Sequence, residues 1–94
     1  MLMIAGKLYM APEERDRWVE AHDEVIKRAR PAPGCLDLSV SADPVEDGWV
    51  NLFELWESEE HLAAWRGAAN PPPKPEISGG NVQKHQISSS GPPF

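Results

Sequence analysis

Three stretches of the chain have the hydrophobic pattern of β-strands. Residues 2–10 (LMIAGKLYM) are mainly apolar at both alternating positions, which is typical of a short strand buried on much of both faces. Between residues 35 and 42 (CLDLSVSA), apolar and polar side chains alternate with a period of two, which indicates a half-buried strand. Residues 43–48 (DPVEDG) are rich in turn formers, so we expect a hairpin that returns as a third strand over residues 49–57.

Two other stretches have the period of an α-helix. Residues 12–30 begin with Pro12 and two glutamates and end with basic residues, which suits the two ends of one amphipathic helix. One stripe of this helix collects apolar side chains and a histidine: Trp18, Val19, His22, Val25, Ile26 and Ala29. The second predicted helix is capped by Ser58, runs to about Arg66 and stops at Gly67.

The C-terminal quarter of the chain is rich in proline and glycine. We expect residues 67–80, which contain PPPKP, to form an extended connection, and residues 82–88 to form a last strand. Residues 1–88 then make a single domain, and residues 89–94 are a C-terminal tail that frays or reaches a neighbouring molecule. The order β-α-β-β-α-β predicts an α+β, ferredoxin-like fold: a four-stranded antiparallel sheet with two helices on one face.

Such a sheet has one face that its own helices do not cover. The strands at residues 2–10 and 49–57 carry apolar side chains on both faces, so the open face would expose a large apolar patch. A second copy packed sheet to sheet would cover this patch, and we therefore predict a homodimer. The alternative is that the proline-rich C-terminal segment folds back over the open face.

Composition narrows the class of partner. The chain has 94 residues and a formal net charge of −6, which repels phosphate backbones and argues against nucleic acid. Cys35 is the single cysteine, and no apolar stretch approaches the length that spans a bilayer. With no recognisable signal peptide at the N-terminus, we expect a cytoplasmic protein that acts away from membranes.

Two runs of sequence resemble the antibiotic biosynthesis monooxygenase (ABM) family. They are ARPAPGCLDLSVSADP (residues 29–44) and NLFELWESEEHLAAW (residues 51–65), in this order after a strand and a helix that begins at Pro12. The resemblance implies a dimeric α/β barrel with a pocket between the sheet and the helices. It also implies oxidation of polycyclic phenols by dioxygen without metal or flavin.

The family pattern is matched only in part. Trp56 matches the tryptophan at the end of a strand, and this makes it a second catalytic candidate, but Leu52 stands where the oxidising members have an asparagine. Asn51 is one position away and should point to the other face. Trp65 resembles the helical tryptophan of haem-degrading members, whereas Lys7 stands near their asparagine, and no histidine closely follows Trp65.

The two predicted helices and the third strand supply the remaining candidates for catalysis and ligand binding. His22 is the main catalytic candidate, because a neutral imidazole could remove a phenolic or enolic proton. Trp18, Phe53 and Trp65 are expected to hold a flat ring system, although aromatic residues at such spacings also serve simply as core. Glu54 should share a face with Trp56, and if this is the dimer face, its buried carboxylate needs a partner such as Lys7 or a backbone donor. The run EERDR (residues 13–17) reads as a solvated helix face.

The leading hypothesis is a cofactor-independent monooxygenase that acts on a small planar aromatic or quinol-type molecule and dioxygen. Neither a metal nor a cofactor is expected, because the three histidines and the single cysteine lack ligand spacing and no Gly-rich phosphate loop follows a strand. The alternative is a non-catalytic dimer that binds a small molecule on the same scaffold. A haem-degrading relative is the third and least favoured hypothesis.

Overall fold

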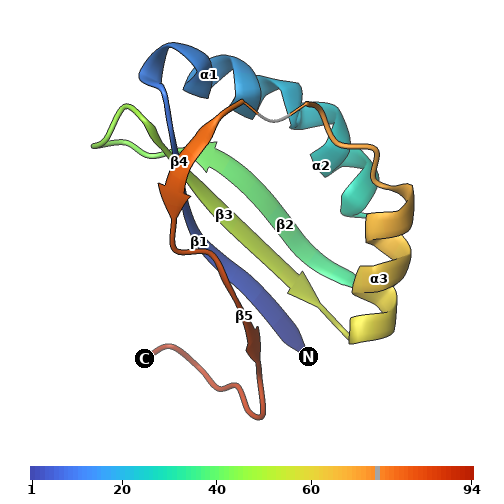
Figure 1. Cartoon of the computed structure of the whole chain (residues 1–94). Coiled ribbons are helices and arrows are strands. Elements are labelled where there is room, and N and C mark those ends of the chain that lie inside the picture. The colour runs from blue at the N-terminus through green and yellow to red at the C-terminus, as the bar shows by residue number, and fades with distance from the viewer. Residues whose placement is uncertain (74) are drawn as a thin grey trace.

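The computed structural model describes residues 1–73 and 75–94 and has an α+β fold. Its elements in chain order are β1 (Leu2–Met10), α1 (Pro12–Ala21), α2 (Asp23–Ala29), β2 (Cys35–Ala42), β3 (Trp49–Trp56), α3 (Glu59–Ala68), β4 (Ile77–Gly80) and β5 (Gln83–Gln86). The sheet is antiparallel in the order β2-β3-β1-β4, with β5 also paired to β1. All three helices lie on one side of it (Figure 1). The predicted ferredoxin-like α+β fold is confirmed.

The edge strand is divided into two pieces, where the sequence predicted one strand at residues 82–88. β4 pairs with the end of β1 and β5 pairs with its beginning. Between them Asn81 bonds to Lys7, with its side-chain Oδ1 accepting from the Lys7 N–H at 2.6 Å and its own N–H donating to the Lys7 carbonyl at 2.9 Å. This crossing is close to Gly6, which has φ +148°, and a Cβ there would lie 2.6 Å from the Cα of Val82. Residues 77–80, expected to be a connection, are thus part of the sheet.

The predicted helix over residues 12–30 is interrupted at His22. The His22 N–H bonds to the Val19 carbonyl at 3.0 Å, which is the tighter i→i+3 pattern. The Trp18 carbonyl, which an uninterrupted helix would bond to the His22 N–H, contacts the His22 Nδ1 at 2.8 Å instead. Because the imidazole competes with the backbone for this carbonyl, one amphipathic stripe becomes two consecutive helices.

Helix α3 continues through Gly67 and ends two residues later than predicted. Its first turn is capped as expected, with the Ser58 hydroxyl accepting from the His61 N–H at 3.2 Å. At the other end Ala69 keeps helical angles, and Asn70 adopts a left-handed φ of +45° immediately before Pro71. Asparagine tolerates this conformation after a helix and proline cannot continue one, so these two residues supply the stop.

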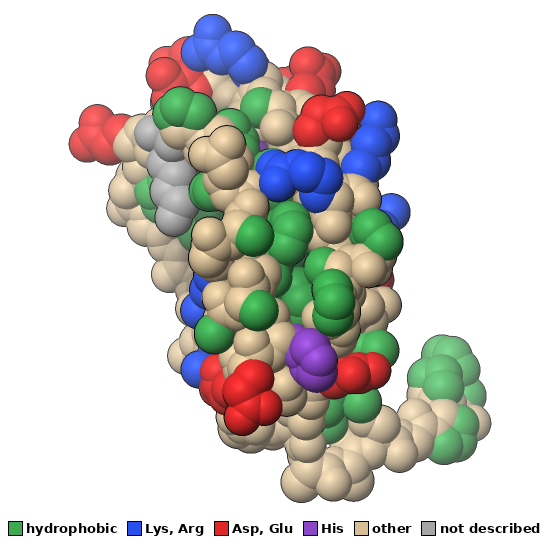
Figure 2. Space-filling view, turned by 90° about the vertical axis from the view of Figure 1, so that its right-hand side faces the viewer, with side chains coloured by type: hydrophobic (Ala, Val, Ile, Leu, Met, Phe, Trp, Pro, Cys, Tyr) green, Lys and Arg blue, Asp and Glu red, His purple; other side chains and the backbone are tan. Residues whose placement is uncertain are grey.

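The two faces of the sheet differ. The face under the helices carries the buried core: Leu2, Ile4, Met10, Trp18, Ala29, Leu38, Val40, Val50, Trp56 and Leu62. The opposite face has no helix over it (Figure 1), and its β1 and β3 side chains are half-buried. Residues 88–94 are all exposed and the tail stands away from the body (Figure 2), so it does not fold back over this open face. No helix of the described residues is long and apolar enough to cross a membrane.

Candidate functional site

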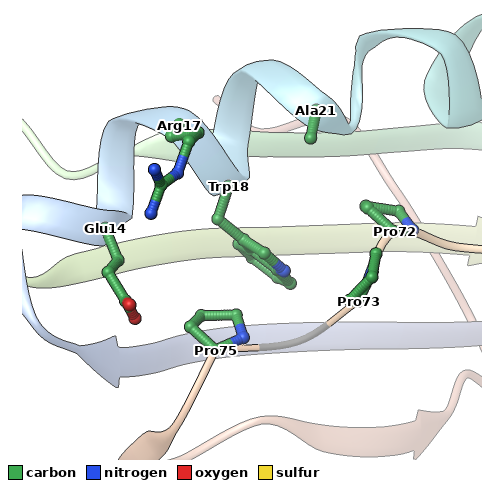
Figure 3. Close-up of a pocket in the computed structure, with 7 residues that line it drawn as sticks. All are labelled: Glu14, Arg17, Trp18, Ala21, Pro72, Pro73 and Pro75. Atoms are coloured by element: carbon green, nitrogen blue, oxygen red, sulfur yellow. The ribbon is translucent and has the colours of Figure 1, made fainter.

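A groove of about 300 Å³ lies between α1 and the segment that follows α3. Figure 3 shows Trp18 pointing down from α1 toward the strands, with Pro75 and Pro73 across from its ring. The residues that line the groove are Glu14, Arg17, Trp18, Ala21, Pro72, Pro73 and Pro75. The tryptophan and the prolines supply flat apolar surfaces, whereas Glu14 and Arg17 supply one charge of each sign on the helix side. This combination suits a flat, mainly apolar molecule with a few polar substituents.

His22 supports the tryptophan of this groove. The centroids of the Trp18 and His22 rings are 4.1 Å apart, and each residue is 7% exposed. Because a carbonyl oxygen only accepts hydrogen bonds, Nδ1 of His22 carries the proton that is donated to the Trp18 carbonyl. In the neutral imidazole Nε2 is then the nitrogen with the free lone pair. His22 itself is not among the residues that line the groove.

Trp56 and Trp65 form a second aromatic pair, between β3 and α3. Their ring centroids are 6.3 Å apart with an angle of 27° between the planes. Trp56 is 0% exposed, and its Nε1–H donates to the Glu54 carboxylate at 3.0 Å. Trp65 is half-buried, with the Arg28 guanidinium 5.9 Å from the centroid of its ring. The pair is a packed part of the core and does not line the groove.

Phe53 lies on the other face of the sheet from Trp18 and Trp65. It is paired with Ala5 of β1 and Ser39 of β2, on the face that the helices leave open. The expectation that these three aromatic residues would surround one ligand is therefore wrong for Phe53. Strand parity is the reason, because Phe53 is one residue away from the helix-facing Leu52 and Glu54.

Glu54 does not pair with Lys7, which was one of the partners expected for it on a dimer face. Glu54 faces the helices, whereas Lys7 faces the open side, where its Nζ lies 3.1 Å from the Asp43 carboxylate. Lys7 also donates to the Asn51 side-chain oxygen, and the Asn51 amide donates to Asp43 at 3.1 Å. These three side chains form a network on the open face, and Lys7 has a charged partner within it.

Arg15 is buried, although the run EERDR was expected to be a solvated face. Its Nη1 donates to the carbonyls of Glu46 at 3.0 Å and Trp49 at 2.9 Å, so it ties α1 to the β2–β3 hairpin. The helical period contains this signal, because residues 15, 18 and 22 fall on one stripe. The proline wall of the groove had no comparable signal, since the position of an irregular segment depends on tertiary contacts.

Comparison with known proteins identifies the family. The model of the family described as antibiotic biosynthesis monooxygenase matches residues 1–70. The chain belongs to the ABM family. A relative in Synechocystis, the uncharacterised protein sll1783, is 26% identical over 61 residues, which are 65% of this chain. The match covers only 42% of that relative's length.

Solved structures agree with ABM membership at the level of the fold. A Deinococcus radiodurans protein placed among the antibiotic biosynthesis monooxygenases superposes with a TM-score of 0.70 at 15% identity, over 100% of this chain and 99% of that one. The heme-degrader MhuD of Mycobacterium tuberculosis, solved with two hemes in its active site, gives a TM-score of 0.66 at 12% identity, over 97% of this chain and 99% of that one. At such identities the likeness concerns the fold alone.

Within the ABM fold, the structure shows where the family's residue pattern falls. Leu52 and Trp56 both face the helices, while Asn51 faces the open side as parity predicted. Leu52 is thus an apolar side chain at the place where the oxidising members have an amide.

Burial, with the Asp37 and Glu54 carboxylates nearby, raises the pKa of the Cys35 thiol, which disfavours a nucleophilic thiolate. No group of His, Cys, Asp and Glu side chains in the described part of the chain is arranged to hold a metal.

Proposed function

We propose that this ABM protein binds a small planar aromatic or quinol-type molecule in the groove over Trp18 and oxidises it with dioxygen, without a metal or organic cofactor. The observation that carries the proposal is the groove itself, in which an aromatic side chain opposes proline rings and the charged groups come from one side. Its volume of about 300 Å³ is at the small end of the range for ligand sites, which suits a ligand of two or three fused rings.

The proposed chemistry starts with removal of a proton from an activated position of the substrate. In an anthrone-type molecule this is a ring CH₂ opposite a carbonyl, and the resulting anion is electron-rich enough to reduce dioxygen. One oxygen atom becomes a new carbonyl at that carbon, and the other leaves as water with the two hydrogens of the CH₂. The reaction consumes one dioxygen for each molecule of quinone formed.

Two side chains near the groove could take the first proton. The proposal assigns this role to His22, because Nδ1 is engaged by the Trp18 carbonyl and Nε2 is left as the basic nitrogen. His22 lies behind Trp18, so the assignment requires the groove to widen beside that ring when substrate binds. Glu14 is the competing candidate, because its carboxylate lines the groove directly.

Oxygen uptake tests the proposal. Anthrone-type compounds should raise oxygen consumption above the spontaneous rate in the presence of the protein, with the quinone as product. Ala21→Trp should block the groove and abolish this increase, because Ala21 lines the groove and is exposed on α1. Ala63→Trp on an exposed position of α3 is the matched control and should leave the rate unchanged. Equal activity in both variants would mean that the reaction does not occur in this groove.

A second function, binding without turnover, is favoured by one observation. Leu52 replaces an amide by an alkyl chain on the helix-facing side of β3, so a hydrogen-bonding group of the oxidising members is absent there. A non-catalytic protein would bind the same planar compounds, and Ala21→Trp would abolish the binding, but oxygen uptake would stay at the spontaneous rate. The haem alternative has its own test, since bound hemin would give a new visible absorption band.

We also propose that the functional unit is a homodimer formed through the open face of the sheet. The groove is on the helix side, so each subunit would keep its own site in this arrangement. The apolar character of the open face supports the proposal.

A further inference from the structure

The indole nitrogen of Trp18 has no hydrogen-bond partner among the described residues. The nitrogen atom is buried, in a side chain that is itself 7% exposed. Figure 3 shows it on the edge of the ring that is turned toward Pro73, where the groove is closed by the segment after α3. Trp56 provides the contrast within the same chain, because its indole N–H is equally remote from solvent but donates to Glu54.

An unpaired buried donor is costly, and native proteins leave few of them. Burying such a group without a partner costs its desolvation free energy with no hydrogen bond in return. The groups around Trp18 do not meet this need, since the carbonyls of the described prolines accept no bond from the indole. An acceptor that enters the groove would supply the missing partner.

We propose that the Trp18 indole N–H is the donor that orients the ligand, by bonding to an oxygen acceptor on the ring system bound in the groove. This inference rests on the proposed function and narrows its substrate class. An indole N–H only donates, so the ligand must present an oxygen acceptor, such as a carbonyl or a hydroxyl, at the edge of a planar apolar skeleton. A flat hydrocarbon of the same shape would fill the groove and leave the donor unpaired.

The wall that covers the nitrogen is suited to admit such a ligand. None of the described prolines from Pro71 to Pro75 takes part in a turn or loop backbone hydrogen bond with the rest of the chain. Pro72, Pro73 and Pro75 lie against the groove by contact alone. An outward shift of these prolines would bring a ligand oxygen within reach of Nε1.

Nuclear magnetic resonance of the indole groups tests this proposal directly. The chain has four tryptophans, and ¹⁵N-labelled protein should give one indole N–H signal for each. The Trp18 signal is the one that disappears in Trp18→Phe. If that variant does not fold, Trp49→Phe, Trp56→Phe and Trp65→Phe assign the other three signals and leave Trp18 by elimination.

The probes are anthraquinone-2-sulfonate and anthracene-2-sulfonate, which share their ring skeleton and charge but differ in the two carbonyl oxygens. The anthraquinone should move the Trp18 indole proton downfield and bind at least about tenfold more tightly than the anthracene, equivalent to roughly 1.4 kcal/mol. In Trp18→Phe this tenfold preference should disappear while the anthracene still binds.

Three other outcomes would overturn the inference in different ways. If both probes bind equally and the Trp18 signal keeps its position, the groove binds planar rings but the indole does not select for oxygen, and the proposed function stands. If neither probe binds, the ligand site in the groove fails and the inference fails with it. An exchange signal between the Trp18 N–H and a bound water that persists with anthraquinone present would show that water is the partner.

Discussion

At the scale of single residues, His22 and Trp18 form one unit in which each side chain limits what the other can do. The imidazole holds the Trp18 carbonyl through Nδ1, so a substitution that changes both nitrogens would mix structural and chemical effects. Asparagine separates them, because its side-chain amide can donate in place of Nδ1 but offers no base in place of Nε2. If His22 takes the substrate proton, His22→Asn should lower turnover about 100-fold or more and leave the melting temperature nearly unchanged.

The matched substitution for this prediction is Glu14→Gln, which removes the carboxylate from the groove and keeps its size. Oxygen uptake by the two variants, beside their thermal unfolding curves, assigns the proton acceptor. Full activity in His22→Asn with loss of activity in Glu14→Gln would transfer the role to Glu14. Full activity in both would leave the proposed mechanism without its base.

At the scale of elements, Arg15 links helix α1 to the hairpin between β2 and β3. Its guanidinium donates to carbonyls of the hairpin from a buried position, so replacing it by methionine leaves these carbonyls without their donor. Arg15→Met should lower the free energy of unfolding by about 2–3 kcal/mol, the value of hydrogen bonds from a charged group. Urea unfolding measures the change, with Arg17→Met on the exposed side of the same turn as control, where a change within about 0.5 kcal/mol is expected. Equal losses in the two variants would contradict this role of Arg15.

The same hairpin predicts how stability depends on pH. The backbone N–H of Glu46, together with the Lys7 ammonium, the Val45 N–H and the Asn51 amide, holds the pKa of Asp43 well below its usual range. A carboxylate with a lowered folded-state pKa stabilises the fold above its unfolded pKa of about 3.9, and this contribution is lost as pH falls toward the folded-state pKa.

Asp43→Asn should therefore be less stable than the wild type at pH 7, and the gap should narrow below about pH 4. Urea unfolding at several pH values measures the difference. Asp47→Asn, at an exposed position of the same hairpin, should unfold like the wild type throughout. A gap between Asp43→Asn and wild type that stays constant down to pH 2 would show that the charge of Asp43 is not the cause.

These elements also show how far the sequence could be read. β1, β2 and β3 were predicted to within one residue, because their hydrophobic period reports the sheet face directly. The break at His22 was missed because it depends on one imidazole competing for one carbonyl, and periodicity does not detect such a bond. β5 lies within the predicted last strand, but β4 was missed for a related reason, since the break between the two pieces lies where Asn81 crosses Gly6, 75 positions away in the sequence.

The candidate site was less predictable than the fold. Trp18 and His22 were selected from the helical stripe and do lie together, but the opposite wall of their groove is an irregular proline segment without a periodic signal. Phe53 is aromatic like the other candidates, but its strand parity places it with Asn51 on the open face. On β3, only residues at even positions face the helices with the core residue Val50, and Phe53 is at an odd position.

At the scale of the whole molecule, the proposed homodimer depends on the open face of the sheet. The Lys7 ammonium on this face already has an ion pair with Asp43 and a hydrogen bond to Asn51 within the same chain. Its charge is therefore compatible with a partner subunit on this face. Tyr9 and Trp49 pack against each other beside it, with ring centroids 5.0 Å apart. A stable dimer typically buries about 800 Å² of surface from each partner.

Light scattering coupled to gel filtration should therefore give twice the chain mass of 10.4 kDa. Phe53→Glu places a carboxylate on this face, where pairing two copies around a twofold axis would bring two uncompensated charges into an apolar interface. We expect that variant to elute as a folded single chain, while Val45→Glu at the exposed hairpin stays dimeric. Circular dichroism separates dissociation from unfolding in the Phe53 variant. A wild-type mass of one chain would contradict the dimer, and a Phe53→Glu protein that remained dimeric would place the interface on another surface.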